Sequence, residues 1–209
     1  MGISVTDSKL GELARMISGW PGLVSGSAQD LIDDSLVLLE HLADGHRLVD
    51  VGSGGGLPGL PLKIAQPSLA VTLIEADQAK AAFLVQACAR LHLEGVEVLA
   101  RRAEEVGQDQ RYRETFDVAV ARAVAPMPVL VELCLPLVRV GGRLLAQKTD
   151  KEPMTPAQRA IEVLGGSRAR VAPARSALRR TGTVVIVEKV RPTPAPYPRR
   201  PGLARRKPL

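Results

Sequence analysis

The chain has few aromatic residues, cysteines and histidines, and each shortage argues against a class of site. Aromatic side chains make up 2% of the 209 residues, which disfavours recognition of nucleic acid by stacking bases on an aromatic platform. The two cysteines, Cys88 and Cys134, stand in apolar stretches and are expected to be buried thiols. The three histidines lack metal-ligand spacing, so we expect no metal site. No apolar run approaches the roughly 18 residues that cross a bilayer, and we see no signal peptide. A cytoplasmic protein without membrane contact is therefore expected.

Acidic side chains are nearly missing from the C-terminal region. Residues 168–209 contain 12 Lys and Arg residues against one acid, whereas residues 1–167 contain 16 against 21. The net charge of +6 thus combines an acidic body with a basic C-terminal region. Such a region suits a phosphate-rich partner, and the alternative is a disordered basic tail that only keeps the protein soluble.

The most informative stretch is residues 48–59, where an apolar run ends in four glycines within five positions. The pattern predicts a strand, a tight turn and a helix N-terminus, where unpaired N–H groups bind an anionic or polar ligand. Residues 54–59 fit the dinucleotide fingerprint G-x-G-x-x-G. Residues 50–56 instead place an aspartate just ahead of the glycines, as S-adenosylmethionine-dependent methyltransferases do. In that register the turn would hold the methionine part of the cofactor through Gly52, Gly54 and Gly56. A glycine-rich turn that binds nothing is the remaining interpretation.

Strands and helices alternate through most of the chain. Strands are predicted over residues 47–51, 70–75, 96–99, 116–121, 143–147, 167–171 and 183–190, and helices over 7–18, 28–42, 58–66, 78–92, 128–138 and 153–164. Near-continuous Val, Leu and Ala runs indicate a mostly parallel sheet. The closing strands have little helix between them. We therefore predict an α/β, Rossmann-like class I S-adenosylmethionine-dependent methyltransferase fold, with a mostly parallel seven-stranded sheet, a C-terminal antiparallel hairpin and N-terminal helices.

This pattern also predicts the organisation of the chain. Residues 1–45 would form an N-terminal helical extension and residues 46–190 the methyltransferase domain. Residues 191–209 are rich in proline and basic residues and are expected to form an extended tail.

Polar residues stand at the ends of several predicted strands, where ligands bind in open α/β sheets. Glu75 lies 23 residues after Gly52, where a carboxylate accepts hydrogen bonds from ribose hydroxyls, although a helix-capping role is the alternative. Ala103 and Glu104 follow the third strand and could read the adenine, although Glu104 alone could equally be a surface residue. Arg122 ends an otherwise apolar fourth strand, so it needs a partner or a ligand.

Five stretches together resemble one family. They are residues 49–59 (VDVGSGGGLPG), 102–105 (RAEE), 121–125 (ARAVA), the tail from Tyr197 to Leu209, and 34–36 (DSL). They are similar to the bacterial 16S ribosomal RNA guanine-N7 methyltransferases, the glucose-inhibited division protein B family, over nearly the whole chain. By that resemblance S-adenosylmethionine is bound by Gly52, Leu57, Ala103, Glu104 and Arg122.

The resemblance also implies partners and differences. Lys148 matches a family lysine, and Arg122 and Lys148 are candidates for contact with the target base or RNA. The partner would be 16S ribosomal RNA or the small ribosomal subunit, met through the basic C-terminal region by a monomer. The chain departs from the family pattern at Leu31, where a histidine is usual, at Thr149, where a glycine is usual, and in the shortened segment 20–25.

The implied reaction is direct methyl transfer to guanine N7, which carries a free lone pair. No general base, nucleophile or metal is then needed, and the rate would come from positioning and from excluding water. Two other functions stay open from the residues alone. An NAD-dependent oxidoreductase would use residues 54–59 but leaves Asp50 and the basic region unexplained. A non-catalytic RNA-binding protein of ribosome assembly would explain the basic region but not the glycine turn.

Overall fold

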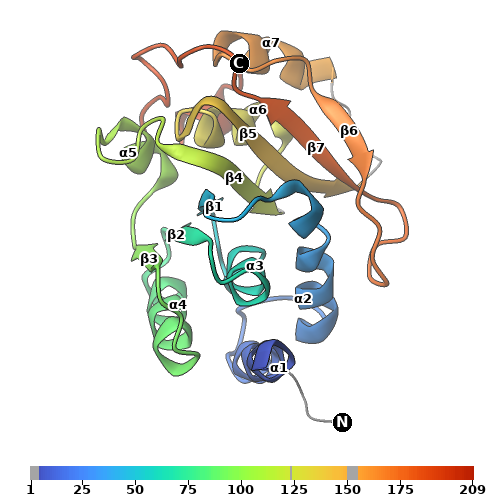
Figure 1. Cartoon of the computed structure of the whole chain (residues 1–209). Coiled ribbons are helices and arrows are strands. Elements are labelled where there is room, and N and C mark those ends of the chain that lie inside the picture. Colours follow the sequence, from blue (N-terminus) through green and yellow to red (C-terminus); the bar gives the residue numbers. More distant parts are fainter. Residues whose placement is uncertain (1–4, 123, 150–154) are drawn as a thin grey trace.

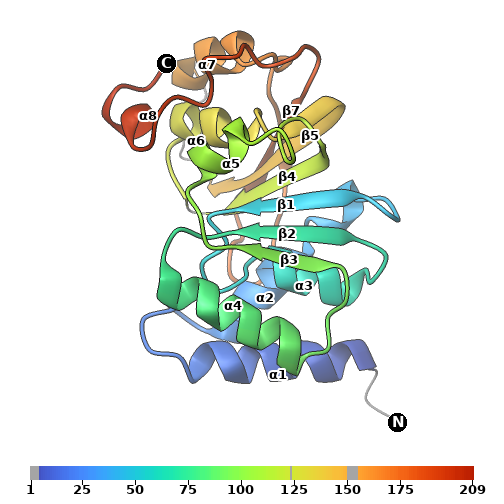
Figure 2. The ribbon, with the colours of Figure 1, turned by 90° about the vertical axis from the view of Figure 1, so that its left-hand side faces the viewer.

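A seven-stranded sheet forms the centre of the protein, and the computed structural model describes residues 5–122, 124–149 and 155–209. The strand order is β3-β2-β1-β4-β5-β7-β6, and Figure 2 shows β3, β2, β1, β4 and β5 side by side. The strands are β1 (Arg47–Val51), β2 (Ala70–Ile74), β3 (Val96–Leu99), β4 (Phe116–Arg122), β5 (Val138–Thr149), β6 (Arg170–Pro173) and β7 (Gly182–Glu188). Neighbours from β3 to β5 pair in parallel, whereas β7 runs antiparallel to both β5 and β6. The predicted seven-stranded Rossmann-like sheet with its antiparallel C-terminal hairpin is confirmed.

Helices cover both faces of this sheet. They are α1 (Val5–Ser18), α2 (Ala28–Leu36), η1 (Leu39–His41), α3 (Gly59–Ala65), α4 (Gln78–Arg90), α5 (Ala103–Gln108), α6 (Met127–Cys134), η2 (Thr155–Ala157), α7 (Gln158–Val163) and α8 (Leu203–Arg206). In Figure 1, α1 to α4 lie below the central strands, and α6, α7 and the C-terminus lie above them. No helix in the described ranges is long and apolar enough to span a membrane.

Alternate residues of the strands belong to two separate hydrophobic clusters. On β4, Val118 and Val120 pack with the residues of α1 to α4, whereas Ala119 and Ala121 pack with those of α6 and α7. The first cluster contains Leu13 of α1 together with residues of α2, α3 and α4. The N-terminal helices therefore share their core with the sheet.

Several element ends differ from the predicted ones for identifiable reasons. The helix predicted to reach residue 42 ends at Leu36, because i→i+3 hydrogen bonds from Leu38 to Ser35 and from His41 to Leu38 replace the α-helical pattern. Strand β5 begins earlier than predicted and runs through Gly141 and Gly142, whose backbone groups pair with Lys189. The fifth predicted helix ends at Cys134 rather than residue 138.

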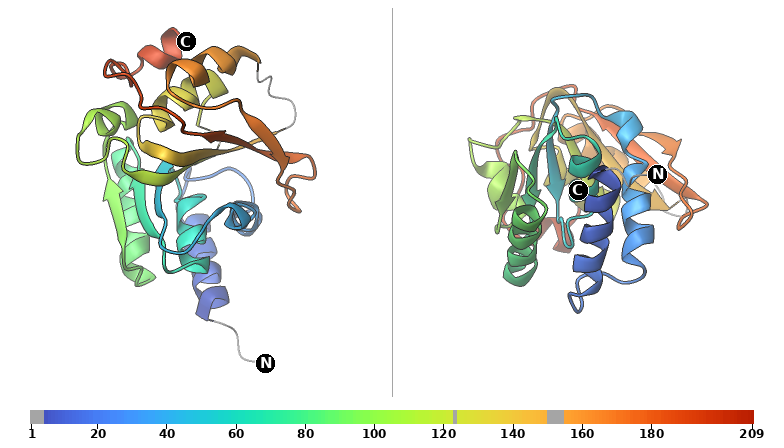
Figure 3. Two further views of the ribbon diagram at one scale, coloured as in Figure 1. Left: turned by 45° about the horizontal axis from the view of Figure 1, so that its top comes forward. Right: turned by 60° about the horizontal axis from the view of Figure 1, so that its bottom comes forward.

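The C-terminal segment, residues 191–209, folds back over α5 and α6. Its backbone is mostly irregular up to the short helix α8, and the side chain of Arg113 donates to the carbonyls of Thr193 and Tyr197 at 2.8 and 2.6 Å. Arg199 pairs with Glu132 of α6. Figure 3 (left) shows the red C-terminal segment on the same side of the sheet as the orange α7. The segment is thus packed against the body and not a free tail.

Candidate functional site

The glycine turn after β1 has the left-handed backbone that its sequence predicts. Gly52 and Gly54 have φ angles of 73° and 54°, a region that other residues rarely adopt. The N–H groups of Gly52 and Ser53 donate to the carbonyl oxygen of Ile74 at 2.9 and 3.0 Å, which ties the turn to the end of β2. A Cβ on Gly52 would lie 3.0 Å from Val124. Any larger residue at this position would therefore press against Val124, in the segment that follows β4.

Asp50, the acid ahead of the glycines, is fully buried on β1. Its Oδ2 accepts a hydrogen bond of 2.9 Å from the N–H of Gly59, the first residue of α3. Burial raises the pKa of Asp50 to about 7, and the Gly59 N–H and the Arg122 charge only partly oppose this effect. Asp50 therefore joins β1 to the N-terminus of α3 beneath the turn.

Glu75 supports the turn from the end of β2. Its two carboxylate oxygens accept hydrogen bonds of 2.8 Å each, Oε2 from the N–H of Gly54 and Oε1 from the N–H of Asp77. A carboxylate oxygen has more than one lone pair, so both oxygens can still accept from a ligand. Glu75 thus shapes the glycine turn and faces the adjoining cavity at the same time.

A smaller cavity of about 250 Å³ lies beyond the ends of β1, β2 and β3. The sequence-predicted residues that line it are Gly52, Glu75, Ala103, Glu104 and Arg122. Gly202 and Arg205 of the C-terminal segment line it as well. The N–H of Gly202 donates to Glu104 Oε1 at 2.9 Å, and Arg205 donates to the Val124 carbonyl at 3.0 Å. The C-terminal segment therefore supplies one wall of this cavity.

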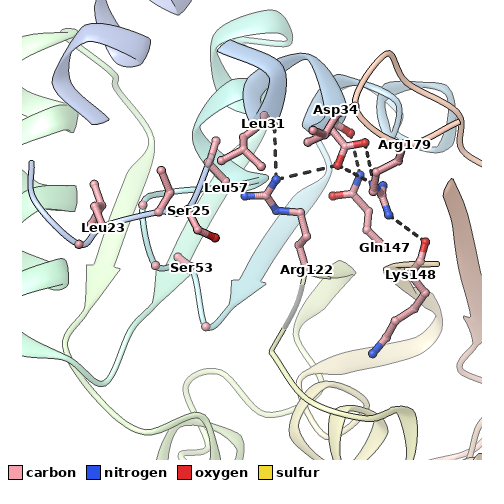
Figure 4. Close-up of a pocket in the computed structure, with 16 residues that line it drawn as sticks. Leu23, Ser25, Leu31, Asp34, Ser53, Leu57, Arg122, Gln147, Lys148 and Arg179 are labelled. Carbon is pink, nitrogen blue, oxygen red and sulfur yellow. Dashed lines mark hydrogen bonds and ion pairs between the residues drawn. The ribbon is translucent and has the colours of Figure 1, made fainter. Parts of the chain in front are cut away.

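A larger cavity of about 780 Å³ lies on the other side of the glycine turn, and Figure 4 shows its side chains. The turn itself contributes Gly52, Ser53, Gly54, Gly55 and Leu57. Residues 22–25, between α1 and α2, lie opposite, and Gly55 leaves room for Leu23 and Val24. Gly52 and Arg122 line both cavities. The two cavities therefore meet at the glycine turn and at the end of β4.

The alternation of β4 and β5 decides where their terminal side chains point. Arg122 and Gln147 are register partners and face α2, where Arg122 Nη1 donates to the Leu31 carbonyl at 3.5 Å. Lys148, the next residue on β5, belongs to the opposite face, and its Nζ donates to the Ala125 carbonyl at 2.6 Å. Desolvation lowers the pKa of the Arg122 guanidinium.

A buried carboxylate, Asp34 of α2, organises the far wall of the larger cavity. Its side chain is 1% exposed and accepts from Arg179 Nε at 2.8 and 2.9 Å and from Ser176 Oγ at 2.6 Å. Arg122 Nη1 lies 3.9 Å from the same carboxylate. Asp34 therefore joins the N-terminal helices to the loop between β6 and β7 and holds positive charge at the cavity.

Comparisons with known proteins identify the family of this chain. The family described as rRNA small subunit methyltransferase G (GidB) matches residues 27–180. The chain is 45% identical over 168 residues to the ribosomal RNA small subunit methyltransferase G of Moorella thermoacetica, with 78% of this chain and 69% of that protein covered. It is 39% identical over 224 aligned positions to that of Roseiflexus sp. strain RS-1, with 100% and 95% covered.

The chain belongs to the methyltransferase G (GidB) family. The similar solved structures support the fold and nothing beyond it. An rRNA methylase from Streptococcus thermophilus aligns with a TM-score of 0.53 at 21% identity, over 75% of this chain and 94% of that one. The T. thermophilus 16S rRNA N2 G1207 methyltransferase in complex with AdoMet and guanosine also aligns with a TM-score of 0.53 at 21% identity, over 75% of this chain and 39% of that one.

In this methyltransferase G family member, most of the sequence-predicted residues meet at the two cavities. Gly54 and Leu57 line the larger one, in addition to the residues common to both, and so does Lys148, whose main-chain carbonyl accepts a hydrogen bond from Arg179. Gly56 lines neither: a Cβ there would lie 2.3 Å from Leu60 of α3, so glycine at this position allows close packing of the helix.

Three charged or amide residues that line the larger cavity had no site role predicted from the sequence, namely Asp34, Gln147 and Arg179. Asp34 carried a signal, because it stands three residues after Leu31 and four before Leu38 on the apolar face of a predicted helix. Gln147 is a polar residue at the end of an apolar strand, which is a weaker signal. Arg179 pairs across 145 residues of sequence, and no local pattern marks that.

The described residues that line these two cavities include no histidine and no cysteine. Burial raises the pKa of the Cys88 thiol to about 11 and moves that of Cys134 further above its ordinary value, so both thiols stay protonated at neutral pH. Nor does the described part of the chain group three or more His, Cys, Asp or Glu residues as a metal site would require.

Proposed function

We propose that this protein transfers a methyl group from S-adenosylmethionine to N7 of a guanine in 16S ribosomal RNA. One observation carries the proposal: the two cavities meet at Gly52 and Arg122, so a group bound along the glycine turn would reach into both. The smaller cavity suits an adenosine, and the larger one leaves room for a second reactant. Membership of the methyltransferase G family supports the same assignment.

The residues present fit S-adenosylmethionine. A Cβ on Gly54 would meet no atom closer than the Gly52 carbonyl oxygen at 4.0 Å, so the backbone of the turn is open to a close ligand on that side. Glu75 would accept from ribose hydroxyls, and Ala103 and Glu104 would contact the adenine at the edge of β3. Arg122 would interact with the carboxylate of the methionine part. When bound, S-adenosylmethionine supplies an electrophilic methyl group on a sulfonium.

Guanine N7 needs little chemical help to accept that methyl group. Its lone pair lies in the ring plane and carries no proton, so no general base is required. The chain would contribute by holding the guanine in line and by excluding water, which accounts for large rate accelerations in two-reactant steps. The absence of histidine and cysteine among the described lining residues agrees with this mechanism.

Exposed basic side chains flank both cavities and would meet the RNA backbone. Arg175 and Arg180 stand in the loop between β6 and β7, next to the larger cavity. Arg205, Arg206 and Lys207 are exposed in and just after α8, next to the smaller cavity. Positive side chains in two patches around one site suit a phosphate backbone that passes over the reacting base.

Methyl transfer from radiolabelled S-adenosylmethionine tests the proposal. Purified 16S RNA and small ribosomal subunits serve as separate substrates, and digestion of the product to nucleosides identifies the methylated atom. We expect the label in 7-methylguanosine. Label in another nucleoside would refute the N7 assignment. Calorimetric binding of NAD but not of S-adenosylmethionine would refute the cofactor, and cofactor binding without any transfer to either RNA substrate would refute the activity.

A further inference from the structure

The larger cavity contains a buried acceptor that no described residue satisfies. Gln147, at the end of β5, is 2% exposed and lines this cavity. Its Nε2 donates to the main-chain carbonyl of Asp34 at 2.7 Å, and its Oε1 has no hydrogen-bond partner within the described ranges. A buried amide oxygen without a donor is unfavourable, so a ligand donor at this point would be stabilised.

The orientation of the amide is set by its partner. A carbonyl oxygen accepts only, so the amide nitrogen must point toward Asp34 and the amide oxygen must point away. Figure 4 shows the Gln147 oxygen on the side of Arg122, toward the interior of the cavity. Arg179, anchored on the carboxylate of Asp34, has a buried Nη2 that is likewise unpaired among the described residues. Asp34 thus orients an acceptor and a donor at one wall.

We infer that Gln147 determines base specificity, its Oε1 accepting a hydrogen bond from the N1–H or the N2 amino group of the target guanine. This inference rests on the proposed function. Guanine carries both donors on the edge of the ring opposite to N7, beside the O6 acceptor. A guanine held by this edge at Gln147 turns N7 away from the wall. Adenine has a lone pair at N1 and no amino group at C2, so it would leave Oε1 without a donor at either position.

Base analogues combined with a variant test the contact directly. The substrates are 16S RNAs that carry guanine, inosine or 2-aminopurine at the guanine mapped by the methylation assay. Inosine lacks the N2 amino group, and 2-aminopurine lacks the N1 hydrogen, while both keep N7. For the wild type we expect at least one analogue to lower kcat/KM by about tenfold or more. For Gln147→Leu, which removes the acceptor, the same analogue should change kcat/KM by less than about twofold relative to guanine.

Two further measurements separate recognition from structure. Gln147→Leu should lower kcat/KM on guanine by roughly 10- to 100-fold and leave the affinity for S-adenosylmethionine unchanged. Leu178→Ala changes the wall of the same cavity without touching a hydrogen bond, so it should leave the ratio between guanine and either analogue as in the wild type. Gln147→Met, of similar volume, repeats the test should the leucine variant fold poorly.

The outcomes are distinct. If each analogue lowers kcat/KM by the same factor in the wild type and in the Gln147 variants, the inference is overturned while the proposed function stands. A wild type that transfers no methyl group to guanine RNA would refute both.

Discussion

Replacement of Arg199 by alanine should loosen the C-terminal segment and open the smaller cavity. Glu132 of α6 is fully buried and accepts three hydrogen bonds from Arg199, from the backbone N–H at 2.9 Å, from Nε at 2.8 Å and from Nη2 at 2.6 Å. Arg199 itself keeps contact with water, since its side chain is 21% exposed. The alanine variant would therefore leave a buried carboxylate without its charge partner.

The size of the effect follows from that buried charge. Removal of one partner of a buried ion pair costs about 3–5 kcal/mol of unfolding free energy. For a chain of this size each kcal/mol lowers Tm by roughly 2–4 °C, so Tm should fall by roughly 6–20 °C. Gly202 and Arg205 follow Arg199 and line the smaller cavity, so S-adenosylmethionine affinity should fall by about fivefold or more, the equivalent of one hydrogen bond.

Arg200→Ala is the matched control. Arg200 is exposed, stands next to Arg199 and carries the same charge. Its loss should change the unfolding free energy by less than about 0.5 kcal/mol and leave cofactor affinity unchanged. If Arg200 meets an RNA phosphate, the slope of log affinity against log salt should fall by about 0.7–0.9. Thermal melts and calorimetry on both variants, with RNA titrations at several salt concentrations, provide these values.

Two results would contradict this reasoning. The first is an Arg199→Ala protein that melts within about 2 °C of Arg200→Ala. The second comes from the double variant Arg199→Ala with Glu132→Gln, in which the neutral amide leaves no buried charge. The double variant should be more stable than Arg199→Ala alone, and a lower stability would show that the buried carboxylate is not the cause.

Three further substitutions test the site. In the Gly54→Val variant the new side chain should project into the larger cavity and abolish S-adenosylmethionine binding detectable by calorimetry. Gly45 has a similar positive φ with open space around it, so the Gly45→Val variant should bind S-adenosylmethionine as the wild type does. Asp50 has a pKa raised from 3.8 to about 7 in the folded state, so between pH 4 and 7 the folded chain keeps a proton that the unfolded chain has lost, and wild-type stability falls over that window. The Tm of Asp50→Asn relative to wild type should therefore rise from about pH 4 to 7 and stay level above about pH 7. Arg122→Ala should reduce methylation at least tenfold and lower unfolding free energy by only about 1 kcal/mol, because Arg179 still pairs with Asp34; a collapse of Tm would make Arg122 structural.

Local patterns predicted the sheet well, and they singled out several residues that line the smaller cavity. Strands over 47–51 and 96–99 begin and end as predicted, because each β-favouring run is bounded by a glycine, Gly52 after the first and Gly95 before the second. The glycine turn and Glu75 could be placed from spacing alone, since each follows directly from a strand end. The predicted cofactor roles of these residues remain predictions that the variants above test.

The far wall of the larger cavity could not be predicted in the same way. It is built from α2, β5 and the loop before β7, which meet only in the folded chain. Arg179 has no distinguishing pattern in its own segment, and its pairing with Asp34 depends on tertiary packing. The proline and arginine content of the C-terminal segment likewise predicts an extended tail, because composition does not reveal which acids lie opposite it.

The acidic residues that face the basic C-terminal region change how the charge imbalance is interpreted. The body is acidic and the region 168–209 is basic, which alone suggests that the basic region serves an external phosphate partner. Among the described residues, three of its twelve basic residues pair with carboxylates of the body, Arg179 with Asp34, Lys189 with Glu114 and Arg199 with Glu132. A share of the positive charge therefore holds the C-terminal segment and the β6–β7 loop against the body. Arg175 and Arg180 stand on the loop that Arg179 anchors, and Arg205 and Arg206 follow Arg199, so the same basic region that pairs with the body also leaves exposed positive charge beside both cavities.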